Sequence, residues 1–232
     1  MNFEYLKQNT DRIRSDIAAA EKEAGRESGS VLMLAAVKYA ETEEIDHLCR
    51  ELGVTDIGEN RVQQLLSHYE TLPNRENINW HFIGTLQTNK VKYIIDKVCM
   101  VHSLDSEKLA AEIDKQAKKH GLVMKVLVEV NSGEEESKSG LMPHEVEEFC
   151  LSLSRYENIK LCGFMTMAPK CEKKEDYLKF FQQTYAEVLD IWTKKLHNIG
   201  KPVISMGMSD SFEEAIACGS DIVRIGRRLF IK

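Results

Sequence analysis

VLMLAAV, at residues 31–37, is a short, continuous apolar run near the start of the chain. Such a run is typical of a strand that is buried on both faces, as the strands of parallel sheets are. A helix follows, because the apolar residues from Ile45 to Leu52 recur at helical spacing. Thr42 stands where it can cap the start of that helix, and Gly53 where it can end it. This part of the chain therefore predicts a strand followed by a helix.

Seven more strand-like runs alternate with helical segments. The runs are 54–58, 79–84, 99–104, 122–131, 159–167, 202–207 and 221–226. The helical segments are about 60–69, a short one after the third strand, 106–120, one that opens at Pro143, 174–197 and 211–218. Eight strands in alternation with helices imply parallel pairing, and 232 residues suit the roughly 250 of a (β/α)8 TIM barrel. We predict an α/β fold of this kind; an open, doubly wound sheet is the alternative, since alternation alone does not close a barrel.

The whole chain, 1–232, is interpreted as one domain. An extra amphipathic helix over about 2–24 is expected to cover the bottom or flank of a barrel that spans about 31–232. The N-terminal residues lack the apolar core and cleavage site of a signal peptide. No apolar run approaches the about 18 residues of a membrane span, so neither a signal peptide nor a transmembrane helix is expected.

Composition narrows the classes of partner. Hydrophobic residues make up 43 % of the chain and charged residues 29 %, an ordinary globular balance. A net charge of −6 gives the protein no electrostatic reason to bind nucleic acid. Six scattered cysteines without a CxxC pair predict buried free thiols in a reducing cytoplasm. The seven histidines form no HExxH motif, so no metal site is predicted.

Lys38 follows the first strand directly. Burial of an ammonium group is costly, so a lysine buried there is expected to have a lowered pKa and a nucleophilic amine, as a Schiff base requires. The alternative is a lysine whose stem lies along the strand end while its charge reaches solvent at the barrel mouth.

Two C-terminal loops predict an anion site. SMGMSDSFEEA (205–215) ends the seventh strand and opens a helix, where Ser211 and Glu214 match a capping box. Free amides there, beside Gly207 and the hydroxyl of Ser209, suit an anion. RIGRR (224–228) ends the eighth strand, and loops after strands seven and eight commonly bind phosphate in barrels. The alternative is ordinary helix capping with a solvated basic tail.

Four further features leave alternatives open. Arg224 lies on an apolar strand and needs either a carboxylate or a ligand as partner. Asn60 ends the second strand and is a candidate helix cap. His81 faces either the barrel interior or the helices, as a satisfied core histidine or a catalytic one. The polar loop 132–140 is a solvated loop or a lid.

Several motifs together resemble the YggS/PROSC family of pyridoxal 5′-phosphate (PLP) homeostasis proteins. They are LAAVK, DIGENRVQ, WHFIGTLQTNK, VHSLDS, VEVN followed by SKSG, GFMTM and SMGMSDSFEEAIACGSDIVRIG, from about residue 32 to residue 230. The resemblance implies a fold-type III PLP barrel, similar to the N-terminal domain of alanine racemase. It also implies that PLP is the cofactor and that Lys38 is its Schiff-base lysine.

The resemblance assigns the other binding residues as well. Asn60 and Met165 would lie near the cofactor. Backbone amides around the phosphate would come from two loops, at Ser205, Met208, Ser209, Gly226 and Arg227. Arg224 would lie against the pyridine nitrogen or near the phosphate. A guanidinium does not give up its proton, so it disfavours a protonated ring nitrogen and broad transaminase chemistry.

The sequence departs from the family in three places. VKYAE replaces the usual SK-T-K around the lysine, which bears on how PLP exchanges between sites. Arg227 stands where a small or hydroxyl residue is common, and the C-terminus ends LFIK without the usual glycine. None of these changes removes Lys38.

Three functions are compatible with these features. The first is a PLP carrier that buffers PLP or delivers it to apo-enzymes, without catalysis. The second is an amino-acid racemase of weak or no activity, because racemisation needs a second acid–base group and only Tyr39 is a tyrosine at a strand end. The third is a barrel enzyme for a phosphorylated sugar, which gives Lys38 no role. A closed barrel leaves no sheet edge, so a monomer is expected rather than a dimer.

Overall fold

Eight parallel strands form a closed barrel in the computed structural model, which describes residues 3–135, 139–195 and 200–232. The strands pair in chain order, and β1 closes the ring by pairing with β8. Their bounds are β1 Leu32–Ala36, β2 Asp56–Glu59, β3 Asn79–Phe82, β4 Met100–Leu104, β5 Met124–Val130, β6 Ile159–Thr166, β7 Val203–Met208 and β8 Ile222–Ile225. The barrel prediction is therefore confirmed, and the open sheet is excluded.

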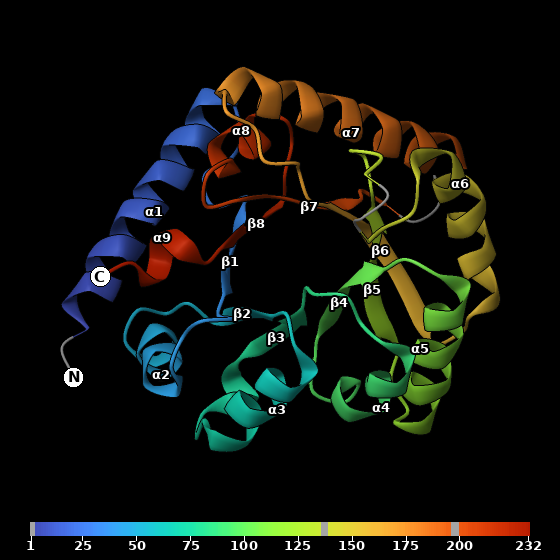
Figure 1. Ribbon diagram of the computed structural model, residues 1–232, viewed down its shortest axis with the longest axis horizontal. Coiled ribbons are helices and arrows are strands. Elements are labelled where there is room, and N and C mark those ends of the chain that lie inside the picture. The colour runs from blue at the N-terminus through green and yellow to red at the C-terminus, as the bar shows by residue number, and fades with distance from the viewer. Residues whose placement is uncertain (1–2, 136–138, 196–199) are drawn as a thin grey trace.

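Helices surround the barrel (Figure 1). They are α1 Glu4–Glu23, α2 Thr42–Arg50, α3 Val62–Thr71, α4 Val91–Ile94, α5 Glu107–Lys119, α6 Pro143–Ser152, α7 Lys174–Lys195, α8 Phe212–Ala217 and α9 Arg227–Phe230. Three short 3₁₀ turns lie at Arg75–Asn77, Thr88–Lys90 and Leu153–Arg155. The extra helix α1 lies along the flank, beside α8 and α9 (Figure 1). Asn9 ties it to the C-terminus by donating to the carbonyl oxygens of Leu229 and Ile231 at 3.0 and 2.8 Å.

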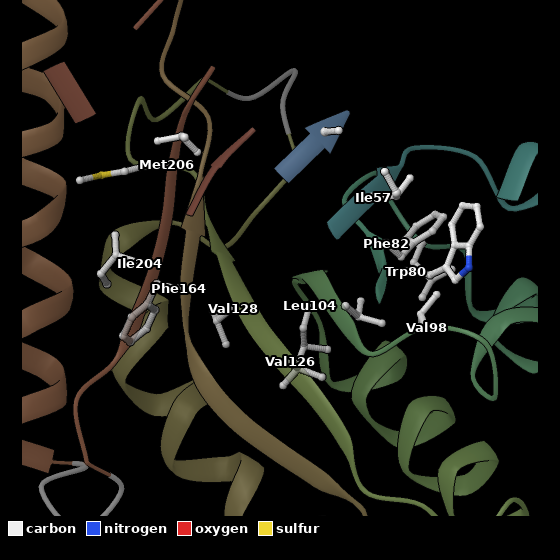
Figure 2. Packing of buried hydrophobic residues seen from close by; sticks show 14 of the residues in the cluster. Ile57, Trp80, Phe82, Val98, Leu104, Val126, Val128, Phe164, Ile204 and Met206 are labelled. Atoms are coloured by element: carbon white, nitrogen blue, oxygen red, sulfur yellow. The ribbon is translucent and has the colours of Figure 1, made fainter. Parts of the chain in front are cut away.

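Alternate residues of β1 face two different layers. Ala35 and Val37 belong to the large core between strands and helices, part of which Figure 2 shows with Trp80, Phe82, Phe164 and Ile204. Leu32, Leu34 and Ala36 pack in a small second cluster with residues of β7 and β8, which lies inside the barrel. The two-residue period of a strand explains this split. It also defines which positions of each strand reach the barrel interior.

Local details differ from the sequence predictions. Glu41, not Thr42, caps α2, because its neighbour Glu44 accepts a hydrogen bond from the Glu41 amide at 2.8 Å. The basic residues after the eighth strand lie in a short helix that the sequence analysis did not predict, α9. The six cysteines are free as expected, but only Cys49, Cys150 and Cys218 are buried, and Cys99 is exposed.

Within the three described ranges, no helix combines the length and apolarity that a bilayer crossing requires. The same residues contain no group of three or more His, Cys, Asp or Glu side chains that could hold a metal ion.

Candidate functional site

Lys38 lies at the C-terminal mouth of the barrel. The interior positions of β1 are 32, 34 and 36, so position 38 continues that row. Val37 keeps the sheet pairing beyond the end of β1 by donating its amide hydrogen to Gly58 O at 3.1 Å. The Lys38 carbonyl oxygen accepts a hydrogen bond from the Gln64 side chain at 2.7 Å. The backbone of the lysine is thus held between β1 and α3.

The Lys38 side chain is exposed, so the expected burial of its amine is wrong. Its Nζ lies 4.5 Å from the centroid of the Tyr39 ring, and Tyr39 is itself 80 % exposed. The chain turns after β1, with Ala40 N bonded to Val37 O, and this turn carries the side chain into solvent. The amine is therefore accessible at the mouth, as the alternative interpretation of Lys38 expected.

The loop after β8 lies directly against the strand that carries Lys38. A Cβ atom added to Gly226 would lie 2.9 Å from the carbonyl oxygen of Ala36. Only glycine allows this approach without a shift of the backbone. The predicted phosphate loop and the lysine strand are therefore in contact at the mouth.

The loops after β7 and β8 are joined to each other. The Arg228 amide donates to Ser209 Oγ at 3.3 Å, and the Arg227 guanidinium pairs with Asp210. Arg227 is exposed and its side chain is engaged by that carboxylate. Gly207 has a φ of +91°, and a Cβ there would lie 2.5 Å from Ala215 Cβ, so the end of β7 also needs glycine.

The predicted capping box is wrong. Ser211 does precede α8, but its hydroxyl makes no cap bond and instead accepts from the Met208 amide at 3.3 Å. Glu214 pairs with Lys174 at 3.1 Å. The hydroxyl thus closes the turn that leads out of β7 and does not cap the first turn of α8.

Arg224 lies inside the barrel and is 4 % exposed. Its Nη1 donates to the carbonyl oxygen and the Oγ of Ser205, at 2.9 and 2.7 Å, and its Nη2 donates to Thr166 O at 2.9 Å. Burial lowers the pKa of the guanidinium to about 10, and the nearby charge of Glu129 opposes that shift. The protein groups that accept from Arg224 are thus two carbonyls and a hydroxyl, and none of them is a carboxylate.

Four other predicted residues lie on neighbouring strands or just after them. Met165 is buried on β6 and pairs in register with the buried Ser205 of β7. Met208 ends β7 and is partly exposed at the mouth. Asn60 follows β2 but does not cap α3, because Arg61 occupies the N-cap position. The predicted loop 132–140 is described only in part, and its residues 136–138 lie outside the described ranges.

Glu129 is a residue that sequence reasoning missed. It is 3 % exposed on β5, and its Oε2 has no hydrogen-bond partner among the described residues. Burial, and then the charge of Asp105, raise the pKa of Glu129 to about 7, although Arg224 opposes the shift. A lone carboxylate in the apolar stretch LVMKVLVEVN was the available signal.

Sequence reasoning missed His102 as well. The structure also decides which way His81 faces. Both histidines are buried, and His81 Nδ1 lies 3.0 Å from His102 Nε2. His102 Nδ1 lies 3.2 Å from Ser205 Oγ on the far side of the barrel. His81 is therefore a satisfied histidine of the barrel interior, not one that faces the helices.

The chemistry available at this mouth is defined by its groups. Lys38 supplies an accessible amine, the Gly226 loop lies against the strand that carries it, and Arg224 supplies a buried cation inside the barrel. Three of the five N–H groups of Arg224 are used by Ser205 and Thr166, and the other two have no acceptor among the described residues. Such a set can hold a small anion that carries a carbonyl group.

Comparison with known proteins identifies similar chains. The family model described as "Alanine racemase, N-terminal domain" matches residues 2–231. A pyridoxal phosphate homeostasis protein of Aquifex aeolicus is 42 % identical over 219 residues, which cover 94 % of each chain. PipY of Synechococcus elongatus PCC7942, solved with PLP bound, is 25 % identical with a TM-score of 0.80 over 93 % of this chain and all of that one.

An alanine racemase of Clostridium difficile shares the fold. Its structure matches 99 % of this chain with a TM-score of 0.75, at 18 % sequence identity. This chain covers 57 % of the racemase's length. The likeness is therefore one of fold, over part of a longer protein.

Proposed function

This chain belongs to the family of the alanine racemase N-terminal domain and, within it, to the pyridoxal phosphate homeostasis proteins, and from that premise we propose that it binds PLP and takes part in intracellular PLP homeostasis. The observation that carries the proposal is the contact between Gly226 and Ala36, which brings the β8 loop against the strand of Lys38. A phosphate held by that loop would leave the other end of the same small molecule near the lysine amine.

The residues at the mouth fit this cofactor. Bound PLP would supply an aldehyde, with which a neighbouring amine could form a Schiff base with loss of water. The Lys38 Nζ provides the amine and is accessible to solvent. The amides of the β7 and β8 loops, at Ser205, Met208, Ser209, Gly226 and Arg227, would hold the phosphate, with Asn60 and Met165 beside the ring. Arg227 would contribute mainly through its backbone, because Asp210 engages its side chain.

Arg224 is assigned to the ring nitrogen. Its guanidinium keeps two N–H donors for a ligand while Ser205 and Thr166 hold the rest. A donor that keeps its charge favours an unprotonated ring nitrogen, which makes the ring a weak electron sink. Arg224 would therefore support retention of PLP without broad amino-acid chemistry.

A carrier is favoured over a racemase. Racemisation needs two acid–base groups on opposite faces of one carbon atom. Tyr39 lies beside Lys38 on the same turn, so it approaches from the side of the lysine. An accessible Lys38 is also suited to reversible exchange, by which PLP would be buffered or delivered to apo-enzymes. Six free thiols support a reducing compartment such as the cytoplasm.

The test combines spectroscopy with mass spectrometry. The purified protein is titrated with PLP, its visible spectrum is recorded, and the mixture is reduced with borohydride and digested. We expect a yellow protein with the reduced adduct on Lys38. An adduct on another lysine, or a protein that stays colourless with added PLP, contradicts the proposal. A racemase assay on alanine and serine then separates carrier from racemase, and rapid racemisation of either would exclude the carrier role.

A further inference from the structure

A chain of hydrogen bonds crosses the interior of the barrel below the candidate site. Asp56 Oδ1 lies 3.2 Å from His81 Nε2, and His81 Nδ1 lies 3.0 Å from His102 Nε2. His102 Nδ1 lies 3.2 Å from Ser205 Oγ, which in turn accepts from Arg224 Nη1 at 2.7 Å. The five side chains come from β2, β3, β4, β7 and β8. The chain therefore joins opposite walls of the barrel and ends on Arg224.

The two ends of this chain have fixed hydrogen-bonding roles. Arg224 can only donate, and an ionised Asp56 can only accept. Burial raises the pKa of Asp56, whereas hydrogen bonds from His81, Asn79 and Thr55 lower it. Asp56 also lines a cavity of ≈ 440 Å³ beside α1, and its side chain keeps 20 % of its exposure. At this solvent-accessible end of the hydrogen-bond chain, the Asp56 carboxylate can stay ionised.

Because Arg224 only donates and Asp56 only accepts, the positions of the protons on the side chains between them are determined. If both histidines are neutral, Asp56 requires a proton on His81 Nε2, so His81 Nδ1 must accept from His102 Nε2–H. His102 Nδ1 is then bare and accepts from Ser205 O–H, while Ser205 Oγ accepts from Arg224. Every donor has one acceptor, and all bonds point from Arg224 to Asp56.

The competing arrangement is less favourable. A charged His81 would donate to both Asp56 and His102, which moves the proton of His102 to Nδ1 and makes Ser205 accept twice. The Ser205 hydroxyl hydrogen would then have no acceptor among the residues that the structure describes, and a buried donor without an acceptor is destabilising. It would also place a second cation in the barrel interior. Burial above all, together with the charge of Arg224, lowers the pKa of His102 well below its usual value, so His102 stays neutral.

We propose that Asp56 is a positioning residue for Arg224. Asp56 acts on Arg224 through the Nε2–H forms of His81 and His102 and through Ser205. The carboxylate sets the two histidine tautomers, and His102 then turns the Ser205 lone pair toward the guanidinium. Arg224 is thereby held with its two unused N–H groups directed toward the position that the proposed function gives to the ring nitrogen of PLP. The inference rests on the proposed function for its purpose, but not for its geometry.

The first test is nuclear magnetic resonance of the protein without PLP. Two-bond proton–nitrogen correlations distinguish Nε2–H, Nδ1–H and charged imidazole rings. We expect His81 and His102 of the native chain to be neutral with the proton on Nε2. A charged His81, or a proton on Nδ1 of either ring, overturns the proposal. This measurement needs no variant and no cofactor.

The second test uses Asp56→Asn, with Asp96→Asn in the turn after α4, where Asp96 is exposed, as a matched control. An amide can donate as well as accept, so it no longer sets one direction for the chain. We expect mixed tautomers at both histidines and a shifted Arg224 Nε–H signal, with the control unchanged. Native-like tautomers together with an unmoved Arg224 signal would show that Asp56 is only structural.

A cofactor readout separates this inference from the proposed function. In Asp56→Asn we expect PLP affinity to fall roughly tenfold, in line with a weakened hydrogen bond to a charged group, and the visible spectrum of the bound PLP to shift. If Asp56→Asn binds PLP as the native chain does, the positioning role is wrong while the proposed function stands. If even the native chain binds no PLP, the proposed function fails, and the Arg224 signal alone decides the positioning role. Where Asp56→Asn fails to fold, Asp56→Glu serves, and it should restore the native tautomers.

Discussion

Gly226, after the last strand, lies so close to Ala36, at the end of the first, that a methyl group on Gly226 would come 2.9 Å from the Ala36 carbonyl oxygen. The close approach lies at the C-terminal mouth, where β8 pairs with β1 and closes the barrel. It also sets how near the β8 loop comes to Lys38, two residues beyond Ala36.

Gly226→Ala should therefore disturb the site. The added methyl group must push the β8 loop away from β1, because backbone atoms cannot yield as a flexible side chain can. We expect PLP affinity to fall roughly tenfold and stability by about 1–3 kcal/mol, measured by titration and by urea unfolding. Gly133→Ala is the matched control, since its Cβ would meet nothing closer than 3.5 Å. Equal PLP affinity in the Gly226 and Gly133 variants would show that the contact does not position the loop.

Lys38→Ala separates the covalent link from the rest of the binding site. The variant should lose the absorption band of the Schiff base but keep weaker PLP binding through the two phosphate loops. Lys170→Ala, an exposed lysine after β6, should behave as the native chain does. Absorption spectroscopy and equilibrium dialysis provide the two readouts. Full retention of the band in Lys38→Ala contradicts the assignment of Lys38.

Arg224→Ala should weaken PLP binding more than Asn60→Ala does. Arg224 has two N–H donors left for a ligand inside the barrel, whereas Asn60 lies in the loop before α3. Both affinities are measured by fluorescence titration, after urea unfolding has shown that each variant is folded. If the two variants bind PLP equally well, the role of Arg224 is structural.

Glu129 should make stability depend on pH. Its pKa of about 7 in the folded protein lies above the usual value of about 4.3, so the folded state binds the proton more tightly than the unfolded one. The contribution of Glu129 is then fully present below about pH 4 and is lost as pH rises through 7, by up to about 3 kcal/mol.

Glu129→Gln removes this titration. Relative to the native chain, the variant should gain free energy of unfolding between pH 5 and pH 8, as measured by urea unfolding at both values. Glu134→Gln, on the exposed loop after β5, serves as the control and should show no such gain. A constant difference between Glu129→Gln and the native chain at the two pH values would refute the assignment.

The positions of the strands were predictable to within a few residues. All eight predicted runs overlap strands of the barrel, because a strand buried on both faces must be apolar nearly throughout. Short-range capping was less predictable. Ser211 and Glu214 have the spacing of a capping box, yet Met208 and Lys174 are their partners. Side chains near a helix end have several acceptors and donors within reach, and packing of the following segments selects among them.

The sequence by itself determined the alternation of strands and helices, the place of Lys38 at a strand end and the presence of glycine-containing loops after the last two strands. Only the tertiary structure decided that Lys38 is exposed, that Glu129 is buried with a free oxygen, and that Arg224 is held by Ser205 and Thr166. Periodicity is a local property, because it reflects which side of one strand is covered. The partners inside a closed barrel come instead from strands far apart in the sequence, as His102 and Ser205 are at 103 residues, and they meet only when the ring closes.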